Sequence, residues 1–267
     1  MERLVEFFKS HNIEYYSVLD YAECREINSR LIEREQFTPR SVIMFVIPYY
    51  AGETVNLSRY AAAKDYHLYI RAFTASLISL FSELFPGSLS AGYGDHSPID
   101  ERYAALLSGL GILGDNGLII NEKYGSYIFI GDVITDIPPE KLGYSGTCEI
   151  RHCFHCGACS LACPTGILRG EGTDCLSAIT QRKGELTAEE ICLMRKINTV
   201  WGCDECQRVC PYNKSPVLTP ISFFREDRIE CLRSDILSSL DKDAFSERAF
   251  AWRGRKTLER NLGLLGY

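Results

Sequence analysis

The chain has twelve cysteines, and ten of them lie between Cys148 and Cys210. This distribution constrains the fold more than any other feature of the 267-residue sequence. The first residues, MERLVEFFKSHNIEYY, carry charges every few positions and show no apolar stretch followed by a small-residue cleavage site, so we expect no secretory signal. Thiols stay reduced in the cytoplasm and rarely form a disulfide framework there. We therefore expect a cytoplasmic protein whose cysteines serve metal or redox chemistry.

Seven of these cysteines form two runs that both end in Cys-Pro. The runs are Cys153-x2-Cys156-x2-Cys159-x3-Cys163-Pro164 and Cys203-x2-Cys206-x3-Cys210-Pro211. The first run has the spacing of bacterial ferredoxins, in which closely spaced thiolates wrap one cubane cluster and the fourth cysteine reaches a second cluster. The second run lacks one ligand. Cys175, which lies between the runs, is the nearest candidate.

Crossed ligation between the runs gives two complete sites of four thiolates. The first site would use Cys153, Cys156, Cys159 and Cys210, and the second would use Cys163, Cys175, Cys203 and Cys206. Zinc also accepts four thiolates, but zinc ribbons rarely show this spacing with a trailing proline. We predict two [4Fe-4S] clusters and keep zinc as the alternative. The other cysteines are expected to be ordinary buried thiols, namely Cys24, Cys148, Cys192 and Cys231.

The uneven cysteine distribution also predicts a boundary, because a segment rich in Pro and Gly precedes the first dense run. We expect residues 1–145 to form an α+β domain, 146–220 an appended cysteine-rich module, and 221–267 a helical tail that packs on the core. The hydrophobic content of 46% is enough for sizeable cores. No apolar run approaches the roughly 18 residues of a spanning helix, so we expect no membrane partner.

Hydrophobic periodicity predicts the elements of the first domain. Helices are expected over Glu2–Lys9, Ala22–Glu35, residues 58–84 as one helix or two, and Pro98–Ser108. Strands are expected over Ser41–Pro48 and, as a hairpin around residues 123–125, over Leu118–Asn121 and Ser126–Thr135. The glycines of Gly109-Leu-Gly-Ile-Leu-Gly114 follow a helical stretch rather than a strand. We interpret them as a turn or a close approach to a flat ligand, not as a dinucleotide loop.

Several further motifs occur in a fixed order along nearly the whole chain. They are Tyr49-Tyr50, Arg59-Tyr60, Asp65-Tyr66-His67, Asp95-His-Ser-Pro98 with Glu101-Arg102, Gly109–Asn116, Cys163-Pro-Thr165, Gly202-Cys-Asp-Glu-Cys-Gln207 with Cys210-Pro-Tyr-Asn213, and Arg260-Asn261. Together they resemble the epoxyqueuosine reductase family. The resemblance implies a nitroreductase-like domain that binds cobalamin, with the two clusters reducing its cobalt and an external electron donor reducing the clusters.

The resemblance also implies a reaction and its residues. Members of the family reduce epoxyqueuosine to queuosine in tRNA, and Asp95 matches their proton donor. Cobalamin contacts would come from Tyr49, Tyr66, His67, Asp95 and Asn116. From the residues alone, the tyrosines and His67 fit core packing equally well, Asp95 fits a loop turn, and Asn116 fits a hydrogen bond within its own loop.

Two other functions stay open at this point: an electron-transfer iron–sulfur protein, and a corrinoid reductase with a non-RNA small-molecule substrate. Longer family members continue into C-terminal helical repeats that help to hold RNA, so a short form that ends at Tyr267 is expected to bind tRNA more weakly. The basic stretch from Arg248 to Arg260 could grip tRNA phosphates or form a solvated helix surface.

Overall fold

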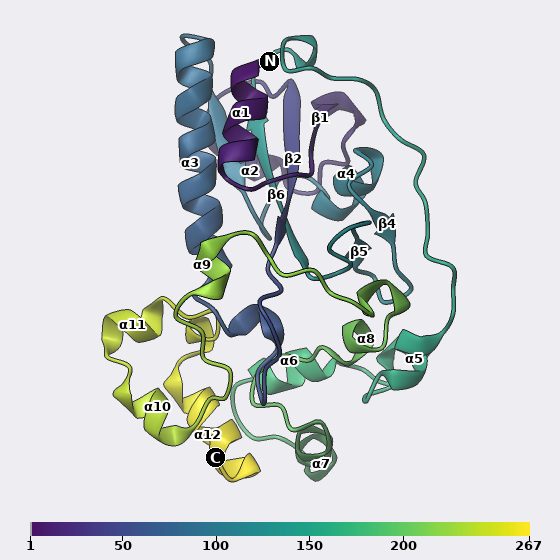
Figure 1. Ribbon diagram of the computed structural model, residues 1–267, viewed down its shortest axis with the longest axis vertical. Coiled ribbons are helices and arrows are strands. Elements are labelled where there is room, and N and C mark those ends of the chain that lie inside the picture. Colours follow the sequence, from purple (N-terminus) through teal and green to yellow (C-terminus); the bar gives the residue numbers. More distant parts are fainter. Residues whose placement is uncertain (1) are drawn as a thin grey trace. The chain divides into compact units, whose positions relative to one another are not determined.

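The computed structural model describes residues 2–267 and forms two compact units (Figure 1). The first unit comprises the chain up to Pro48 together with His67–Phe154, and the second comprises Tyr49–Tyr66 together with His155–Tyr267. The chain therefore passes between the units three times, and a short early segment belongs with the cysteine-rich part. The assignment of separate functions to residues 1–145, 146–220 and 221–267 stays a prediction.

The first unit is built around an antiparallel sheet with the strand order β1-β2-β6-β3, and β4 pairs separately with β5. Its elements are α1 (Glu2–Ser10), β1 (Tyr16–Asp20), η1 (Tyr21–Glu23), α2 (Ser29–Glu35), β2 (Ser41–Pro48), α3 (Tyr66–Leu84), β3 (Ser90–Tyr93), α4 (Glu101–Leu107), β4 (Ile112–Leu113), β5 (Ile119–Ile120), β6 (Ile128–Thr135) and η3 (Pro139–Lys141). The mixed fold of helices and sheet is confirmed.

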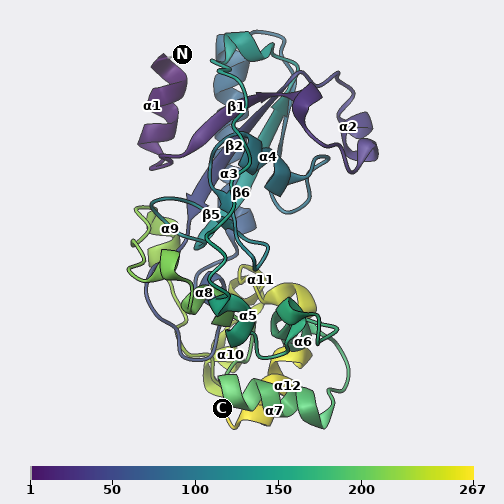
Figure 2. The same ribbon diagram turned by 90° about the vertical axis from the view of Figure 1, so that its right-hand side faces the viewer.

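Strand β2 is buried along its whole length because helices cover both faces of the sheet. Successive side chains of a strand point to opposite faces. Phe45 packs against Phe8 of α1 and Phe73 of α3, with ring centroids 6.4 and 4.8 Å apart. On the other face Met44 shares a core with Ala104 of α4. Figure 1 shows α1 and α3 on one side of the strands and α4 on the other, and Figure 2 shows the same unit turned by 90°. This layering explains why Ser41–Pro48 is apolar without alternation.

Two of the predicted elements of the first unit are wrong in part. The predicted helix over Ala22–Glu35 is α-helical only from Ser29, after the short 3-10 helix η1. The backbone N–H groups of Ile27 and Asn28 donate to the carbonyl of Pro98 instead of to a helical turn. The predicted hairpin keeps only its turn, where Asn121 and Gly125 exchange backbone hydrogen bonds. Beyond that turn β5 pairs with β4, and β6 pairs with β2 and β3.

The glycines of the 109–114 stretch flank strand β4, and Gly109 lies in a turn after α4, as interpreted from the sequence. Gly109 has a φ of +70°, a conformation that favours glycine. A Cβ on Gly111 would lie 2.6 Å from a side-chain carbon of Ile119, so its close neighbour is strand β5. The close approach is therefore explained by protein packing, without a ligand.

The second unit is mainly helical. Its elements are η2 (Arg59–Ala61), α5 (Ala158–Ala162), η4 (Ile167–Arg169), α6 (Leu176–Gln181), α7 (Ala188–Ile197), α8 (Glu205–Arg208), η5 (Pro211–Asn213), α9 (Ser222–Arg225), α10 (Ser234–Ser239), α11 (Lys242–Ser246), η6 (Ala251–Arg253) and α12 (Arg255–Leu265). Trp201 is fully buried at its centre, in one core with Leu57, Phe250 and Leu258. The early segment and the C-terminal helices thus share this core. Among residues 2–267, no helix is both long and apolar enough to cross a membrane.

The arginines of the basic C-terminal stretch have structural roles that neither interpretation anticipated. Arg248 is buried and pairs with Asp227 at 2.8 Å. Arg255 donates to the carbonyls of Leu237 and Leu240, and Arg260 donates to those of Arg182 and Gly184. The guanidinium groups of Arg248, Arg255 and Arg260 thus bind carbonyl and carboxylate groups of the second unit, whereas Lys256 is exposed, and phosphate binding by this stretch stays a prediction.

We expect Phe45→Ala to weaken the first unit, because it leaves a cavity where three aromatic rings meet. The local unfolding free energy should fall by about 3–5 kcal/mol, measured as faster hydrogen exchange of the β2 and β6 amides. Val5→Ala on α1, where the side chain is half exposed, is the matched control and should change it by less than about 0.5 kcal/mol. Unchanged exchange in the Phe45 variant would contradict this packing.

Candidate metal centre and acidic cavity

The first cysteine run folds around α5, which carries Cys159 and ends at Cys163. Burial raises the pKa of the Cys163 thiol, but backbone hydrogen bonds from Leu168, Thr165 and Gly166 outweigh this effect, so its pKa is lowered overall. Hydrogen bonds that favour a thiolate are what an iron–sulfur ligand requires. The local backbone therefore prepares this sulfur for a metal.

The second run starts at Cys203 and continues into α8, which carries Cys206. Burial raises the pKa of Cys203 to about 12, and the nearby negative charges of Cys175 and Cys206 contribute to the rise. The thiolates of Cys175, Cys203 and Cys206 would repel one another, and a bound cation would offset this repulsion. Helices α5 and α8 contact each other, which brings the two runs side by side (Figure 1).

Seven of the eight predicted ligands belong to the second unit. The exception is Cys153 in the first unit, whose backbone N–H donates to the carbonyl of Leu113 at 2.9 Å. The donor set is entirely thiol, and all twelve cysteines are free of disulfides. These residues fit the chemistry of cubane clusters, and the division of ligands between the two clusters stays a prediction.

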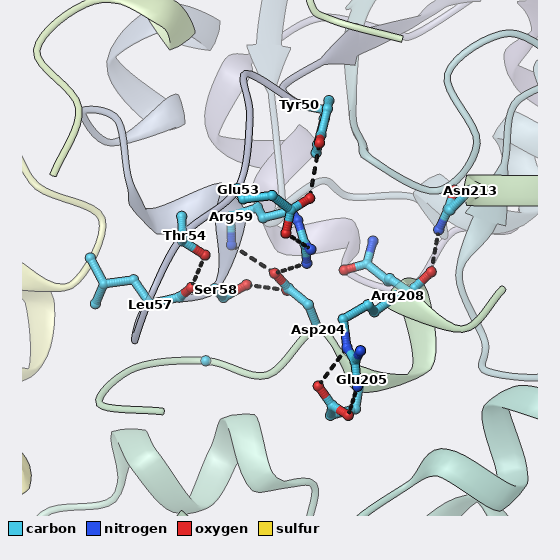
Figure 3. Close-up of polar contacts among 12 residues, drawn as sticks. Tyr50, Glu53, Thr54, Leu57, Ser58, Arg59, Asp204, Glu205, Arg208 and Asn213 are labelled. Carbon is cyan, nitrogen blue, oxygen red and sulfur yellow. Dashed lines mark hydrogen bonds and ion pairs between the residues drawn. The ribbon is translucent and has the colours of Figure 1, made fainter. Parts of the chain in front are cut away.

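A buried ion pair anchors the second cysteine run, and sequence reasoning assigned it no role. Asp204, between Cys203 and Cys206, accepts hydrogen bonds from the hydroxyl of Ser58, from the backbone N–H of Arg59 at 2.8 Å and from the guanidinium of Arg59 at 3.1 Å (Figure 3). Both charged side chains are more than nine-tenths buried. The guanidinium also pairs with the more exposed Glu53. The early segment is therefore fastened to the cysteine loop.

Gly202 allows this anchor to form. Its φ is +77°, and a Cβ there would lie 2.4 Å from the Cβ of Ser58. Any other residue would push Ser58 away from Asp204. The Arg59-Tyr60 and Gly202–Gln207 motifs of the sequence were the available signal, because they contain Arg59, Gly202 and Asp204, although Ser58 and Glu53 lie outside them.

In the first unit, a cavity of about 160 Å³ has an acidic side and an apolar side. The acids Asp95 and Glu101 form one side together with Arg102, and the apolar side includes Leu118 and Ile128. Asp95 adopts the left-handed conformation with a φ of +64°, and its backbone N–H donates to Glu101 Oε1 at 3.2 Å. Its carboxyl is 60% exposed and lies 3.8 Å from Nε2 of His67. The carboxyl of Asp95 faces an apolar side of the cavity, an arrangement that suits proton donation to a group bound there.

The residues predicted to bind cobalamin are distributed over both units. Tyr49 and Tyr66 are buried in the second unit, where Gln207 donates to the hydroxyl of Tyr49 at 3.2 Å. His67, Asp95 and Asn116 belong to the first unit. Asn116 accepts a hydrogen bond from the backbone N–H of Leu118 at 3.3 Å, so its predicted role within its own loop is confirmed. The cavity of the first unit, at about 160 Å³, has room for a small reacting group, and the predicted corrin contacts stay a prediction.

The expectation of buried thiols outside the ligand set is wrong for Cys148 and Cys192, which are exposed. Cys192 lies on the solvent side of α7, whose buried side is formed by Met194. Cys148 lies in an extended segment after η3. Cys24 and Cys231 are partly buried.

Residues 152–213 match the family described as a 4Fe-4S double cluster binding domain. The match covers both cysteine runs and Cys175. Together with the thiol chemistry above, it defines the second unit as part of an iron–sulfur protein with two [4Fe-4S] clusters.

The chain belongs to the epoxyqueuosine reductase family. It is 33% identical over 207 residues to epoxyqueuosine reductase from Listeria monocytogenes, covering 74% of this chain and 53% of that protein. The structure of epoxyqueuosine reductase from Streptococcus thermophilus has the same fold, with a TM-score of 0.78 at 23% identity over 99% of this chain and 81% of that chain. An epoxyqueuosine reductase crystallised with an epoxyqueuosine-modified tRNA-Tyr stem loop gives a TM-score of 0.75 at 24% identity, over 99% and 80%. The chain spans about half the length of the curated relatives it matches.

We expect Asp204→Asn to reduce cluster content, because it removes the charge that balances the buried Arg59 guanidinium. Breaking a buried pair costs about 3–5 kcal/mol, so anaerobically purified protein should lose iron and sulfide from the second run. The neighbouring Glu205→Gln is the control, since it removes only the more exposed pair with Arg208 at 2.8 Å. Full iron content in the Asp204 variant would contradict the anchoring role.

Proposed function

We propose that this chain reduces epoxyqueuosine to queuosine in tRNA. The observation that carries the proposal is the carboxyl of Asp95 at an apolar-walled cavity, in a chain that also holds a double-cluster domain. Family membership supports the substrate, and the relative crystallised with a modified tRNA stem loop supports tRNA as the partner. Among residues 2–267 the cysteines form no disulfide, which favours a reducing compartment, and we propose a cytoplasmic location on that basis.

The reaction removes the epoxide oxygen and leaves an alkene. Two electrons and two protons enter, both carbon–oxygen bonds break, and the oxygen leaves as water. When bound, the two clusters and cobalamin would supply the electrons through low-valent cobalt. The chain's own residues must hold the substrate and deliver protons to the departing oxygen.

Asp95 is the proposed proton donor. Its side chain faces the cavity from a loop whose left-handed turn is held by the hydrogen bond to Glu101. Nearby His67 can orient the carboxyl or accept a hydrogen bond from it. Leu118 and Ile128 on the opposite side would exclude water from a bound group.

The direct test uses anaerobically prepared, cofactor-loaded protein with tRNA from a strain that lacks epoxyqueuosine reductase. We expect nucleoside mass spectrometry to show conversion of epoxyqueuosine to queuosine. Clusters and bound corrin without conversion would favour a corrinoid reductase with another substrate. Clusters without corrin would favour an electron-transfer protein.

We expect Asp95→Asn to slow conversion by about 10²–10⁴-fold, because an amide cannot donate the required proton. Iron, sulfide and cobalt contents should stay unchanged in this variant. Asp243→Asn, at an exposed position of α11, is the matched control and should keep full activity. Normal conversion by the Asp95 variant, or loss of a cofactor from it, would refute the proton-donor role.

A further inference from the structure

The carboxyl groups of Glu101 and Asp132 interact with each other, and the proposed reaction does not yet use this pair. Asp132 is completely buried in β6 and accepts a hydrogen bond from the hydroxyl of Ser97 at 3.2 Å through Oδ2. Its other oxygen, Oδ1, is buried and receives no hydrogen bond from any N–H or hydroxyl donor among residues 2–267. A buried carboxylate with an unsatisfied oxygen is costly.

The carboxyl of Glu101 is within hydrogen-bonding reach of Asp132. Two ionised carboxylates would repel each other there, whereas a protonated Glu101 could donate to Asp132 and satisfy the buried oxygen. No lysine or arginine within residues 2–267 forms an ion pair with either group, so a cation does not replace the proton.

The surroundings of the pair also favour the protonated state. Burial and the negative charges of Asp132 and Asp95 raise the pKa of Glu101. Burial likewise raises the pKa of Asp132, although hydrogen bonds from Ser97 and Glu101 oppose the rise. The phenol of Tyr93 and the thiol of Cys24 are further titratable groups near Asp132. Arg102 lines the same cavity as Glu101, and its guanidinium donates to the carbonyl of Gly117 at 3.3 Å.

We propose that Glu101 and Asp132 hold one proton between them at neutral pH and pass it through Glu101 to Asp95. This inference rests on the proposed function for its role, but the shared proton itself does not depend on the substrate. Glu101 and Asp95 line the same cavity, and Glu101 Oε1 already contacts the backbone N–H of Asp95.

The proton balance is simple. Asp95 gives its proton to the departing oxygen as a carbon–oxygen bond breaks and becomes a carboxylate. Glu101 then transfers its proton to Asp95, which gives it to the oxygen as the second carbon–oxygen bond breaks and water leaves. Two protons from the solvent then restore Asp95 and the Glu101–Asp132 pair. Glu101 is thus a positioning residue that acts through Asp95, and the pair returns to its starting state after each cycle.

Infrared spectroscopy of cofactor-loaded protein that carries Asp95→Asn tests the shared proton without any turnover, because the amide removes the band that a protonated Asp95 would add, and the variants below are made in this background. We expect the carbonyl band of a protonated carboxylic acid at pH 7, shifted in D₂O. Glu101→Gln keeps an oxygen that can accept the Asp95 N–H but cannot titrate, and it should abolish the band. Asp132→Asn should also abolish it, because the amide can donate to an ionised Glu101. Glu122→Gln, at an exposed site of the same unit, is the control and should keep the band.

The pH dependence of tRNA conversion tests the transfer to Asp95. We expect the alkaline limb of the rate profile to move at least one pH unit lower in Glu101→Gln, so that conversion at pH 8 falls about tenfold while conversion at acidic pH is retained. A purely structural role would lower the rate equally at every pH. Iron and cobalt contents of the variant check that it has folded.

The outcomes separate the two proposals. If the infrared band is absent at pH 7 or persists in both variants, the shared proton is refuted even if tRNA is converted. If the band behaves as expected but the pH profile of Glu101→Gln matches that of the unmodified protein, the transfer to Asp95 is refuted. If the band behaves as expected and no tRNA is converted, the proposed substrate fails while the acid pair stands.

Discussion

The buried ion pair between Arg59 and Asp204 is the contact on which the organisation of the second unit depends. It joins a segment that lies between β2 and α3 in the sequence to a loop nearly 150 residues later. An exposed ion pair could not hold these two segments together, because solvent screens its charges and it contributes little to stability. A buried pair must instead be satisfied by several hydrogen bonds at once, and Ser58 and the backbone of Arg59 provide them. Because Asp204 lies between Cys203 and Cys206, these hydrogen bonds also hold the two cysteines in place.

Each unit brings together acidic groups that would repel one another as anions: thiols in the second unit and carboxyl groups in the first. In the second unit the thiols gather where anions would repel, and backbone hydrogen bonds favour the thiolate of Cys163, so the arrangement calls for cationic iron. In the first unit the carboxyl groups of Glu101 and Asp132 lie together, and neither forms an ion pair with a lysine or arginine among residues 2–267, so the arrangement calls for a proton. A reductive removal of oxygen needs both an electron supply and an acid, and the chain provides a distinct environment for each.

The sequence predicted those parts whose signal is local. Cysteine spacing identified the double-cluster domain, and the apolar run of Ser41–Pro48 identified the central strand. Sequence patterns did not predict features that depend on contacts between residues far apart in the chain. Strand β5 pairs with β4 instead of β6. Two N–H groups of the expected second helix donate to the carbonyl of Pro98, and Arg260 donates to carbonyls far away in the sequence. Asp204, Glu101 and Asp132 received no role for the same reason. Their function depends on burial and on neighbours that spacing does not reveal.

The central claim is that eight thiolates hold two iron–sulfur cubanes, and metal analysis of the unmodified chain tests it most directly. Protein isolated and reconstituted without oxygen should contain about eight iron and eight sulfide per chain, four of each for every cluster. Zinc in their place, or iron amounting to less than one cluster per chain, would contradict the account.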